Sequence, residues 1–518
     1  MLNPQVQNWI VRKPLARGAG GVVAGQNIHA ARAGARALAA GGHAIDGALT
    51  TAMALAALEP WNSGLGGIGF MVVWDASAKR AQVVDCGPIA SKRLDPGDYP
   101  LSGEAGADLF GWPGVVEDRN VHGPLSIAVP ALVDGWRLAH ETWGRRPWAE
   151  LAEPAIAFAE GGLPVDWWLT LKVANEAKPL GRYESSRRIW LVDGLPPVAA
   201  GPGAYPRVKI SGLAGTLRRL AAEGPRGFYE GKLSRALVDD LRAVGARVDA
   251  ADLASYRARL LPALELARDG ATLALAPGLT AGPTFERALG QLPDSFARPG
   301  PGADAFVAYA GALRAAYAER LERMGAETVA AHTTHLNAVD RDGNMVALTQ
   351  TLLSSFGSRV VLPETGVVMN NGVYWFDPRP GRPNSMAPGK KPLTNMCPVV
   401  ARRGNAGWFA VGASGGRRIL PAVLQMTSFI VDHGLDLEAA AHHPRIDVSD
   451  PDTVTYDPRL APGVRDALAA QFPTRGYEHV AFPGGYASPS AVLRDGAGAC
   501  GIGDAMSPWS GAVAEDDA

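Results

Sequence analysis

The stretch HTTHLNAVDRDGNMVALTQT, residues 332–351, contains two alternating apolar segments separated by Asp, Arg, Gly and Asn. This pattern predicts a β-hairpin with a tight turn. If Arg341–Gly343 form a three-residue loop with the glycine in the left-handed region, Thr333 lies opposite Thr351. A two-residue Asp-Gly loop places Leu352 opposite Thr333 instead. The stretch therefore predicts a strand pair with a threonine at its open end, and two registers remain open.

The segments before and after this hairpin differ in character. Residues 28–60 predict two helices separated at Gly41-Gly42, and residues 303–325 predict one long amphipathic helix. After His332 the apolar segments are short and are bounded by Gly, Asn and Asp, which is typical of strands. Helices around a strand-rich centre predict a layered α/β protein.

The composition indicates a folded chain without a nucleic-acid-binding surface. The chain has 518 residues, of which 47% are apolar, and its 62 Gly and 40 Pro indicate many tight turns. Its 51 acidic and 50 basic residues nearly cancel, and no strongly basic stretch occurs. We therefore expect no nucleic-acid partner.

The sequence lacks the pattern of a membrane segment or of a secretory signal. The first twenty residues have no apolar stretch of signal-peptide length, and no run of 18 apolar residues follows. Cys86, Cys397 and Cys500 are odd in number and widely spaced, which is typical of reduced thiols. We expect a cytoplasmic protein that does not bind a membrane.

Two motifs could indicate a cofactor or a metal, but their contexts do not fit. GLGGIG, residues 64–69, matches a dinucleotide-binding pattern, yet a helix precedes it and a strand follows, which reverses the required order. His332 and His335 could bind a metal, but no Asp, Glu or Cys completes a ligand set at typical spacing. We therefore expect a tight glycine turn, no cofactor and no metal.

A third motif, GASGG at residues 412–416, fits the strand–turn–helix context of a serine nucleophile, here Ser414. Possible triad partners follow at Asp432, His433, His442 and His443. Few residues remain after Ser414 to form the sheet that must carry them. The same turn can instead present backbone N–H groups to an oxyanion. The spacing alone leaves both uses open.

Several segments then match one known pattern in order along nearly the whole chain. The first is AGGHAIDGALTTAMALAALEPWNSGLGGIGFMVV, followed by GPLSIAVPALVDGWRLAHETWG, GPRGFYEGKL and DLASYRAR. The last are TTHLNAVDRDGNMVALTQTLLSSFGS, MNNG, KKPLTNMCP and GASGGRRI. Together these segments resemble the γ-glutamyltranspeptidase family of N-terminal-nucleophile hydrolases.

This resemblance implies a four-layer αββα sandwich, made as a precursor that cleaves itself between His332 and Thr333. Residues 1–332 would form a large chain and residues 333–518 a small chain, both parts of one αββα domain. Thr333 is the implied nucleophile, because a freed α-amine on the same residue can take the proton of its hydroxyl.

The resemblance also assigns supporting roles. Thr351 matches the threonine that steadies the nucleophile. The backbone of Gly415 and Gly416 matches the oxyanion hole, which leaves Ser414 a structural role.

The implied substrate site differs from that of the γ-glutamyl enzymes. The substrate-binding candidates are Thr349, Asn371, Trp375, Arg382, Thr394 and Asn395. Where those enzymes hold the α-carboxylate and α-ammonium of the substrate, this chain has Gly87 and Leu353. Gly372 and Trp375 replace two further polar residues, and Thr394-Asn395 replaces paired serines. An ammonium buried beside Leu353 and Trp375 would lack a charge partner, so we expect γ-glutamyl compounds to be poor substrates.

The sequence therefore predicts a cofactor-free N-terminal-threonine amidohydrolase or acyltransferase that acts on a small amide with a non-γ-glutamyl acyl group. Such a site would be similar to those of acylases and oxamate-amidohydrolase-like relatives. A serine hydrolase that uses Ser414 and a non-catalytic homologue that is not processed are the alternatives.

Overall fold

The computed structural model describes residues 10–105, 112–201, 203, 205–297, 300–324, 332–481 and 485–518. Two seven-stranded sheets form the centre of the molecule, and every strand pairing within them is antiparallel. Sheet I has the order β1 (Ala16–Gly18), β20 (Gly498–Ile502), β19 (Ser488–Asp495), β15 (Ala406–Ser414), β14 (Val399–Arg403), β11 (Ala271–Leu275) and β10 (Leu264–Arg268). Sheet II has the order β21 (Gly511–Ala514), β2 (Val22–Gly25), β12 (His332–Val339), β13 (Met345–Leu353), β3 (Ile68–Asp75), β4 (Arg80–Cys86) and β9 (Arg259–Pro262).

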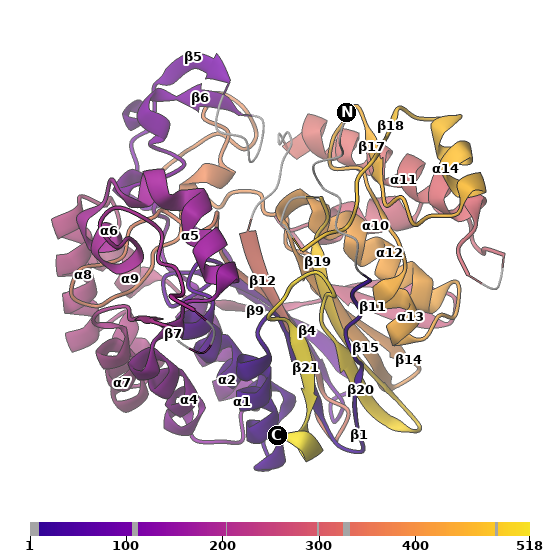
Figure 1. Cartoon of the computed structure of the whole chain (residues 1–518), viewed down its shortest axis with the longest axis horizontal. Coiled ribbons are helices and arrows are strands. Elements are labelled where there is room, and N and C mark those ends of the chain that lie inside the picture. Colours follow the sequence, from indigo (N-terminus) through magenta and orange to yellow (C-terminus); the bar gives the residue numbers. More distant parts are fainter. Residues whose placement is uncertain are drawn as a thin grey trace.

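Helices cover the outer faces of both sheets (Figure 1). On the side of sheet II lie α1 (Ile28–Ala39), α2 (Ala44–Leu58), α3 (Leu132–Trp143), α4 (Trp148–Gly161), α5 (Trp167–Leu180), α6 (Glu184–Trp190), α7 (Leu213–Glu223), α8 (Lys232–Val244) and α9 (Ala250–Ser255). On the side of sheet I lie α10 (Gly282–Leu289), α11 (Ala303–Met324), α12 (Ile419–Val431), α13 (Leu437–His442) and α14 (Pro462–Ala469). The order of layers is helix, sheet, sheet, helix, as the resemblance predicted.

Short strands lie outside the two large sheets. They are β5 (Leu101–Ala105), β6 (Pro113–Val115), β7 (Leu163–Pro164), β8 (Arg207–Val208), β16 (Ile446–Asp447), β17 (Val454–Tyr456) and β18 (Thr474–Gly476). The β5–β6 pair projects from one end of the molecule (Figure 1).

Small residues let the layers approach closely. Helices α1 and α2 pack against each other at Gly34 and Gly47. A Cβ on Gly34 would stand only 2.5 Å from the Gly47 carbonyl oxygen, so a larger residue would push the helices apart. Gly412 of β15 faces His335 of β12, and a Cβ there would stand 2.2 Å from the imidazole ring. The predicted break between the first two helices is confirmed, because α1 ends at Ala39 and α2 begins at Ala44.

The predicted hairpin also forms. Val339 pairs with Met345, and Asp340 N donates to Asn344 O at 3.1 Å, so residues 341–343 form a three-residue loop in which Gly343 adopts a φ of +85°. This was the first of the two registers that the sequence left open. Among the described residues, no helix is long and apolar enough to span a lipid bilayer. The three cysteines are buried free thiols.

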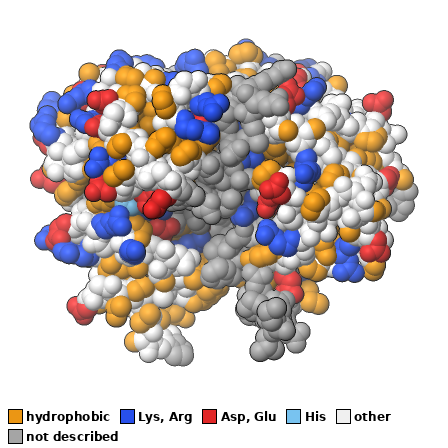
Figure 2. Space-filling view, turned by 90° about the horizontal axis from the view of Figure 1, so that it is seen from above, with side chains coloured by type: hydrophobic (Ala, Val, Ile, Leu, Met, Phe, Trp, Pro, Cys, Tyr) orange, Lys and Arg blue, Asp and Glu red, His pale blue; other side chains and the backbone are white. Residues whose placement is uncertain are grey.

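The surface carries both signs of charge. On the face in Figure 2, lysine and arginine side chains are interspersed with aspartate and glutamate.

Candidate active site

Thr333 occupies an irregular position in the hairpin. Thr334 pairs with Gln350 and His332 pairs with Leu353, so Thr333 stands opposite two residues of β13 rather than one. This arrangement is a β-bulge, which bends a strand and redirects a side chain. Both Thr351 and Leu352 therefore lie opposite Thr333. The two registers predicted from the sequence placed only one of these residues there.

The bulge is held by Thr351 and by Asn371. Thr351 Oγ accepts a hydrogen bond from Leu353 N at 2.7 Å, while Leu353 adopts a left-handed φ of +84°. Such a conformation strains a residue with a Cβ, and strain of this kind is common at functional sites. Asn371 N donates to Leu352 O at 3.0 Å, and its side-chain oxygen accepts from Ser354 N at 3.0 Å. The side chains of Thr351 and Asn371 therefore fix the strand that faces Thr333.

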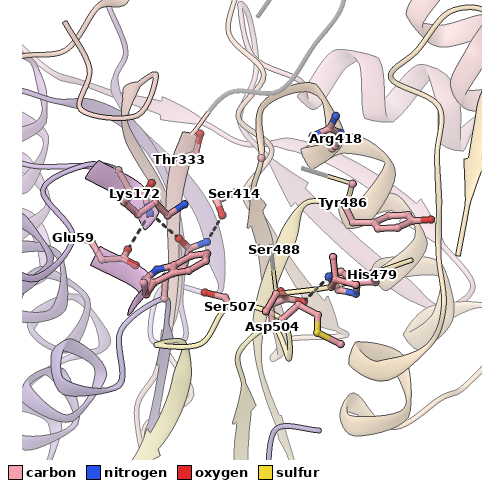
Figure 3. A pocket seen from close by; sticks show the side chains of 18 of the residues that line it. Glu59, Lys172, Thr333, Ser414, Arg418, His479, Tyr486, Ser488, Asp504 and Ser507 are labelled. Carbon is pink, nitrogen blue, oxygen red and sulfur yellow. Dashed lines mark hydrogen bonds and ion pairs between the residues drawn. The ribbon is translucent and has the colours of Figure 1, made fainter. Parts of the chain in front are cut away.

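A cavity of about 230 Å³ opens at this end of the hairpin. Thr333, Ser414 and Gly415 contribute to its wall, and Figure 3 shows Thr333 and Ser414 next to each other. Polar and charged residues from several elements complete the lining, namely Gln26, Glu59, Asn62, Lys172, Asn175, Arg418, Glu478, His479, Ser488, Asp504 and Ser507. The cavity is large enough for part of a small organic molecule.

The glycine turn after β15 requires residues without a Cβ. Gly415 has a φ of +133° and Gly416 a φ of +62°, and a Cβ on Gly415 would stand 2.8 Å from Ala487 Cα. A short 3₁₀ turn, Gly416–Arg418, then leads directly into α12. Unpaired backbone N–H groups at such a helix start favour a negative charge.

Ser414 lies in the cavity but without the triad that a serine nucleophile needs. Its Oγ accepts a hydrogen bond from the side chain of Gln26. Asp432 and His433 follow α12, whose 13 residues span about 20 Å. Asp432 forms an ion pair with Arg268.

The remaining histidines do not complete a triad either. His433 contacts the Tyr309 hydroxyl at 3.0 Å, and His442 accepts from Lys13 N at 3.1 Å. His443 Nδ1 lies 2.9 Å from the Pro444 carbonyl oxygen. His479 lines the cavity near Asp504, but within the described residues no hydrogen bond joins it to Ser414.

A buried carboxyl group fixes the residue after Thr333. Thr334 Oγ donates to Glu59 Oε2 at 2.7 Å and lies 3.2 Å from Gln26 Oε1. Asn62 donates to the same two side chains at 3.3 and 3.4 Å. Burial raises the pKa of Glu59, and the hydrogen bond from Thr334 partly opposes this shift. The network anchors β12 to the end of α2 directly beside Thr333.

A second polar network lies between the two sheets. His335 Nδ1 is 2.9 Å from Thr349 Oγ, and His335 Nε2 is 3.0 Å from Asn337 Oδ1. Asn337 Nδ2 donates to Ser490 O of β19 at 2.9 Å. Burial lowers the pKa of His335 to about 4, so the ring is neutral at pH 7. Thr349, expected to bind substrate, is here a partner of His335.

The other predicted substrate residues lie outside the lining of this cavity. Trp375 is buried in a 3₁₀ turn, Gly372–Trp375, and Arg382 is exposed. Thr394 O accepts from Arg320 at 2.6 Å, and Asn395 Oδ1 lies 3.5 Å from the same guanidinium group. Of the six candidates, none is among the cavity-lining residues in the described part of the chain.

Sequence reasoning missed Gln26, Glu59, Asn62 and Lys172. Two of them had a signal in the quoted segment ALEPWNSG, where Glu59 and Asn62 interrupt an otherwise apolar stretch. Lys172 had none, because a lone lysine is normally solvated. In the part of the chain that the structure describes, no cluster of three or more His, Cys, Asp or Glu could hold a metal.

Solved structures with the same architecture identify the fold. A cephalosporin acylase from Bacillus halodurans superimposes with a TM-score of 0.83 over 99% of both chains, at 23% identity. The chain therefore has the same αββα fold as this acylase.

Sequence comparison identifies the family. The family model for γ-glutamyltranspeptidase matches residues 30–332 and 324–513. The acylase ACY 1 proenzyme of Pseudomonas sp. strain SE83 is 32% identical over 484 residues, which cover 86% of this chain and 85% of that protein. The glutathione hydrolase proenzyme of Escherichia coli K12 is 28% identical over 488 residues, which cover 82% and 80%. The chain belongs to the γ-glutamyltranspeptidase family of enzymes.

Proposed function

We propose that the chain cleaves itself between His332 and Thr333, and that Thr333 then hydrolyses or transfers the acyl group of a small amide. The observation that carries this proposal is the position of Thr333 at a bulge, in the wall of the same cavity as Gly415. A nucleophile must stand near the donors that stabilise the oxyanion it creates. The relatives in the family carry names of proenzymes, which supports processing of this chain.

Each residue has a defined task in this mechanism. The α-amine of Thr333, freed by the cleavage, takes the proton of the hydroxyl as Oγ attacks the amide carbonyl. The N–H groups of Gly415 and Gly416 donate hydrogen bonds to the negatively charged oxygen that forms from the carbonyl. The amine leaves with the proton, and water or an acceptor amine then resolves the acyl-enzyme. Thr351 holds the strand opposite Thr333 through its bond to Leu353 N.

The acyl group that we propose is not γ-glutamyl. Leu353 is buried and apolar at the position that the resemblance assigns to the binding of the α-ammonium. Trp375 is likewise buried. A charged ammonium beside these two side chains would lose its hydration without gaining a partner. Asn371, Arg382, Thr394 and Asn395 remain the proposed contacts for the acyl part.

Intact mass spectrometry tests the proposal. Prorated from 54.2 kDa, a cut before Thr333 gives chains of about 35 and about 19 kDa with Thr333 as a new N-terminus. Thr333→Ala should remain one chain and show no amide turnover. Ser414→Ala should still be processed and active. An uncut and active wild-type chain, or loss of turnover only in Ser414→Ala, would refute the threonine mechanism.

A further inference from the structure

Lys172 is an unusual side chain in the cavity wall. It projects from α5 into the lining, and only 5% of its surface is exposed. Its Nζ lies 4.3 Å from the centre of the Trp168 ring. Among the described residues it has no hydrogen bond and no ion pair, so its three N–H donors are unused.

The acidic groups around the cavity do not serve as its partner. Glu59 is engaged by Thr334 and Asn62, and Glu176 forms an ion pair with Arg359 at 3.0 Å. The negative charges of both carboxylates raise the pKa of Lys172, but less than burial lowers it. Asp504 and His479 lie on the opposite wall in Figure 3. Burial lowers the pKa of Lys172 to about 8, so the group is still mostly protonated at pH 7. An unpaired buried ammonium is costly, and it becomes favourable when an anion arrives.

The location indicates which part of a substrate would meet Lys172. The cavity lining includes Thr333 and Gly415 but none of the four residues proposed above for acyl binding. If the acyl part extends from Thr333 toward those residues, the amine side of the scissile bond occupies the cavity. This step rests on the function proposed above.

We propose that Lys172 forms a subsite for a carboxylate on the leaving or accepting amine, so that the enzyme prefers amides whose amine carries a negative charge. The Lys172 ammonium lies over the Trp168 ring, and Trp168, which also lines the cavity, gives an aromatic surface to the same amine. The residue thus determines specificity and takes no part in bond cleavage.

Two free amines of matched shape provide a direct binding test. The probes are 5-amino-2-nitrobenzoate and 4-nitroaniline, which differ by one carboxylate. Isothermal titration calorimetry on the purified wild-type protein should show that 5-amino-2-nitrobenzoate binds roughly tenfold more tightly than 4-nitroaniline. A charge-assisted hydrogen bond in a buried site increases affinity by about this factor.

Variants assign the preference to one side chain. Lys172→Met should bind both amines with the affinity that wild type has for 4-nitroaniline. Lys178→Met changes the same charge at an exposed position of the same helix and should behave as wild type. Lys172→Gln keeps a polar end without the charge and should also lose the preference.

Three outcomes would overturn the proposal: equal affinity for both amines, no detectable binding of either, or a preference that persists in Lys172→Met. Because the probes contain no amide, these outcomes are independent of Thr333. Thr333-dependent turnover without this preference refutes the subsite alone. Selective binding to a chain that never cleaves itself refutes only the nucleophile.

Discussion

Replacing Lys172 by Met should stabilise the protein. Burial lowers the pKa of this lysine from 10.5 to about 8. Each pKa unit corresponds to about 1.36 kcal/mol, so the charged side chain costs the folded state about 3 kcal/mol at pH 7. Met has a similar length and no charge. At about 2.1 cal/mol/K of unfolding entropy per residue, this cost corresponds to an increase in Tm of about 3 °C for a chain of 518 residues.

The stabilisation by Lys172→Met should depend on pH and be larger at pH 7 than at high pH. The folded pKa lies below the unfolded one, so the cost is complete below about pH 8 and disappears as the pH rises toward 10.5. The measurement is the Tm of wild type, Lys172→Met and Lys178→Met at pH 7 and at about pH 9.5. The difference in Tm between each variant and wild type is then compared at the two pH values. The gain in Lys172→Met should shrink to less than half at the higher pH. A Tm for Lys172→Met at or below that of wild type at pH 7 would show that the ammonium is not buried unpaired.

Three further predictions concern the sheets and the substrate. Because the pKa of His335 is about 4 in the folded protein, below its usual 6.5, protonation favours unfolding, and stability should fall as the pH drops from 6.5 to 4 by about 3 kcal/mol; acid unfolding of His335→Gln should show a smaller loss. Gly412→Ala should lower stability by about 1–3 kcal/mol, because a Cβ would overlap the His335 ring; an unchanged Tm would contradict this packing. Wild type should turn over γ-glutamyl-4-nitroanilide slowly, and Leu353→Asn should increase this rate, since asparagine tolerates the left-handed φ and offers a polar group; rapid wild-type turnover would exclude the proposed acyl preference.

Local chemistry made much of the fold predictable. The Asp-Arg-Asp-Gly-Asn turn favours a three-residue loop, and this loop fixed the register as far as Thr334. The double glycine at residues 41–42 separates two helices in the same way. Both depend on neighbours in the chain, so short-range rules suffice.

The candidate site depends on contacts that the sequence does not encode locally. The bulge at Thr333 arises from the left-handed conformation of Leu353, which a leucine does not signal. Lys172 reaches the cavity because α5 packs near the end of α2, and the periodicity of a helix does not specify its neighbours. The glycine turn at Gly415 and Gly416 was recognisable, because its motif and its strand–helix context occupy one short segment.

The strand order gives the proposed cut a particular physical meaning. In sheet II, strands from the two parts of the chain are interleaved: β2 from the first part lies between β21 and β12 from the second, and β13 from the second part pairs with β3 from the first. In sheet I, β1 and β11 from the first part flank four strands from the second. A cut before Thr333 would therefore give two polypeptides that are woven together. Dilution would not separate them, because dissociation would expose the hydrophobic core and amount to unfolding. The two polypeptides would become associated when the uncut chain folds. Their association would therefore not depend on the concentrations of two free partners.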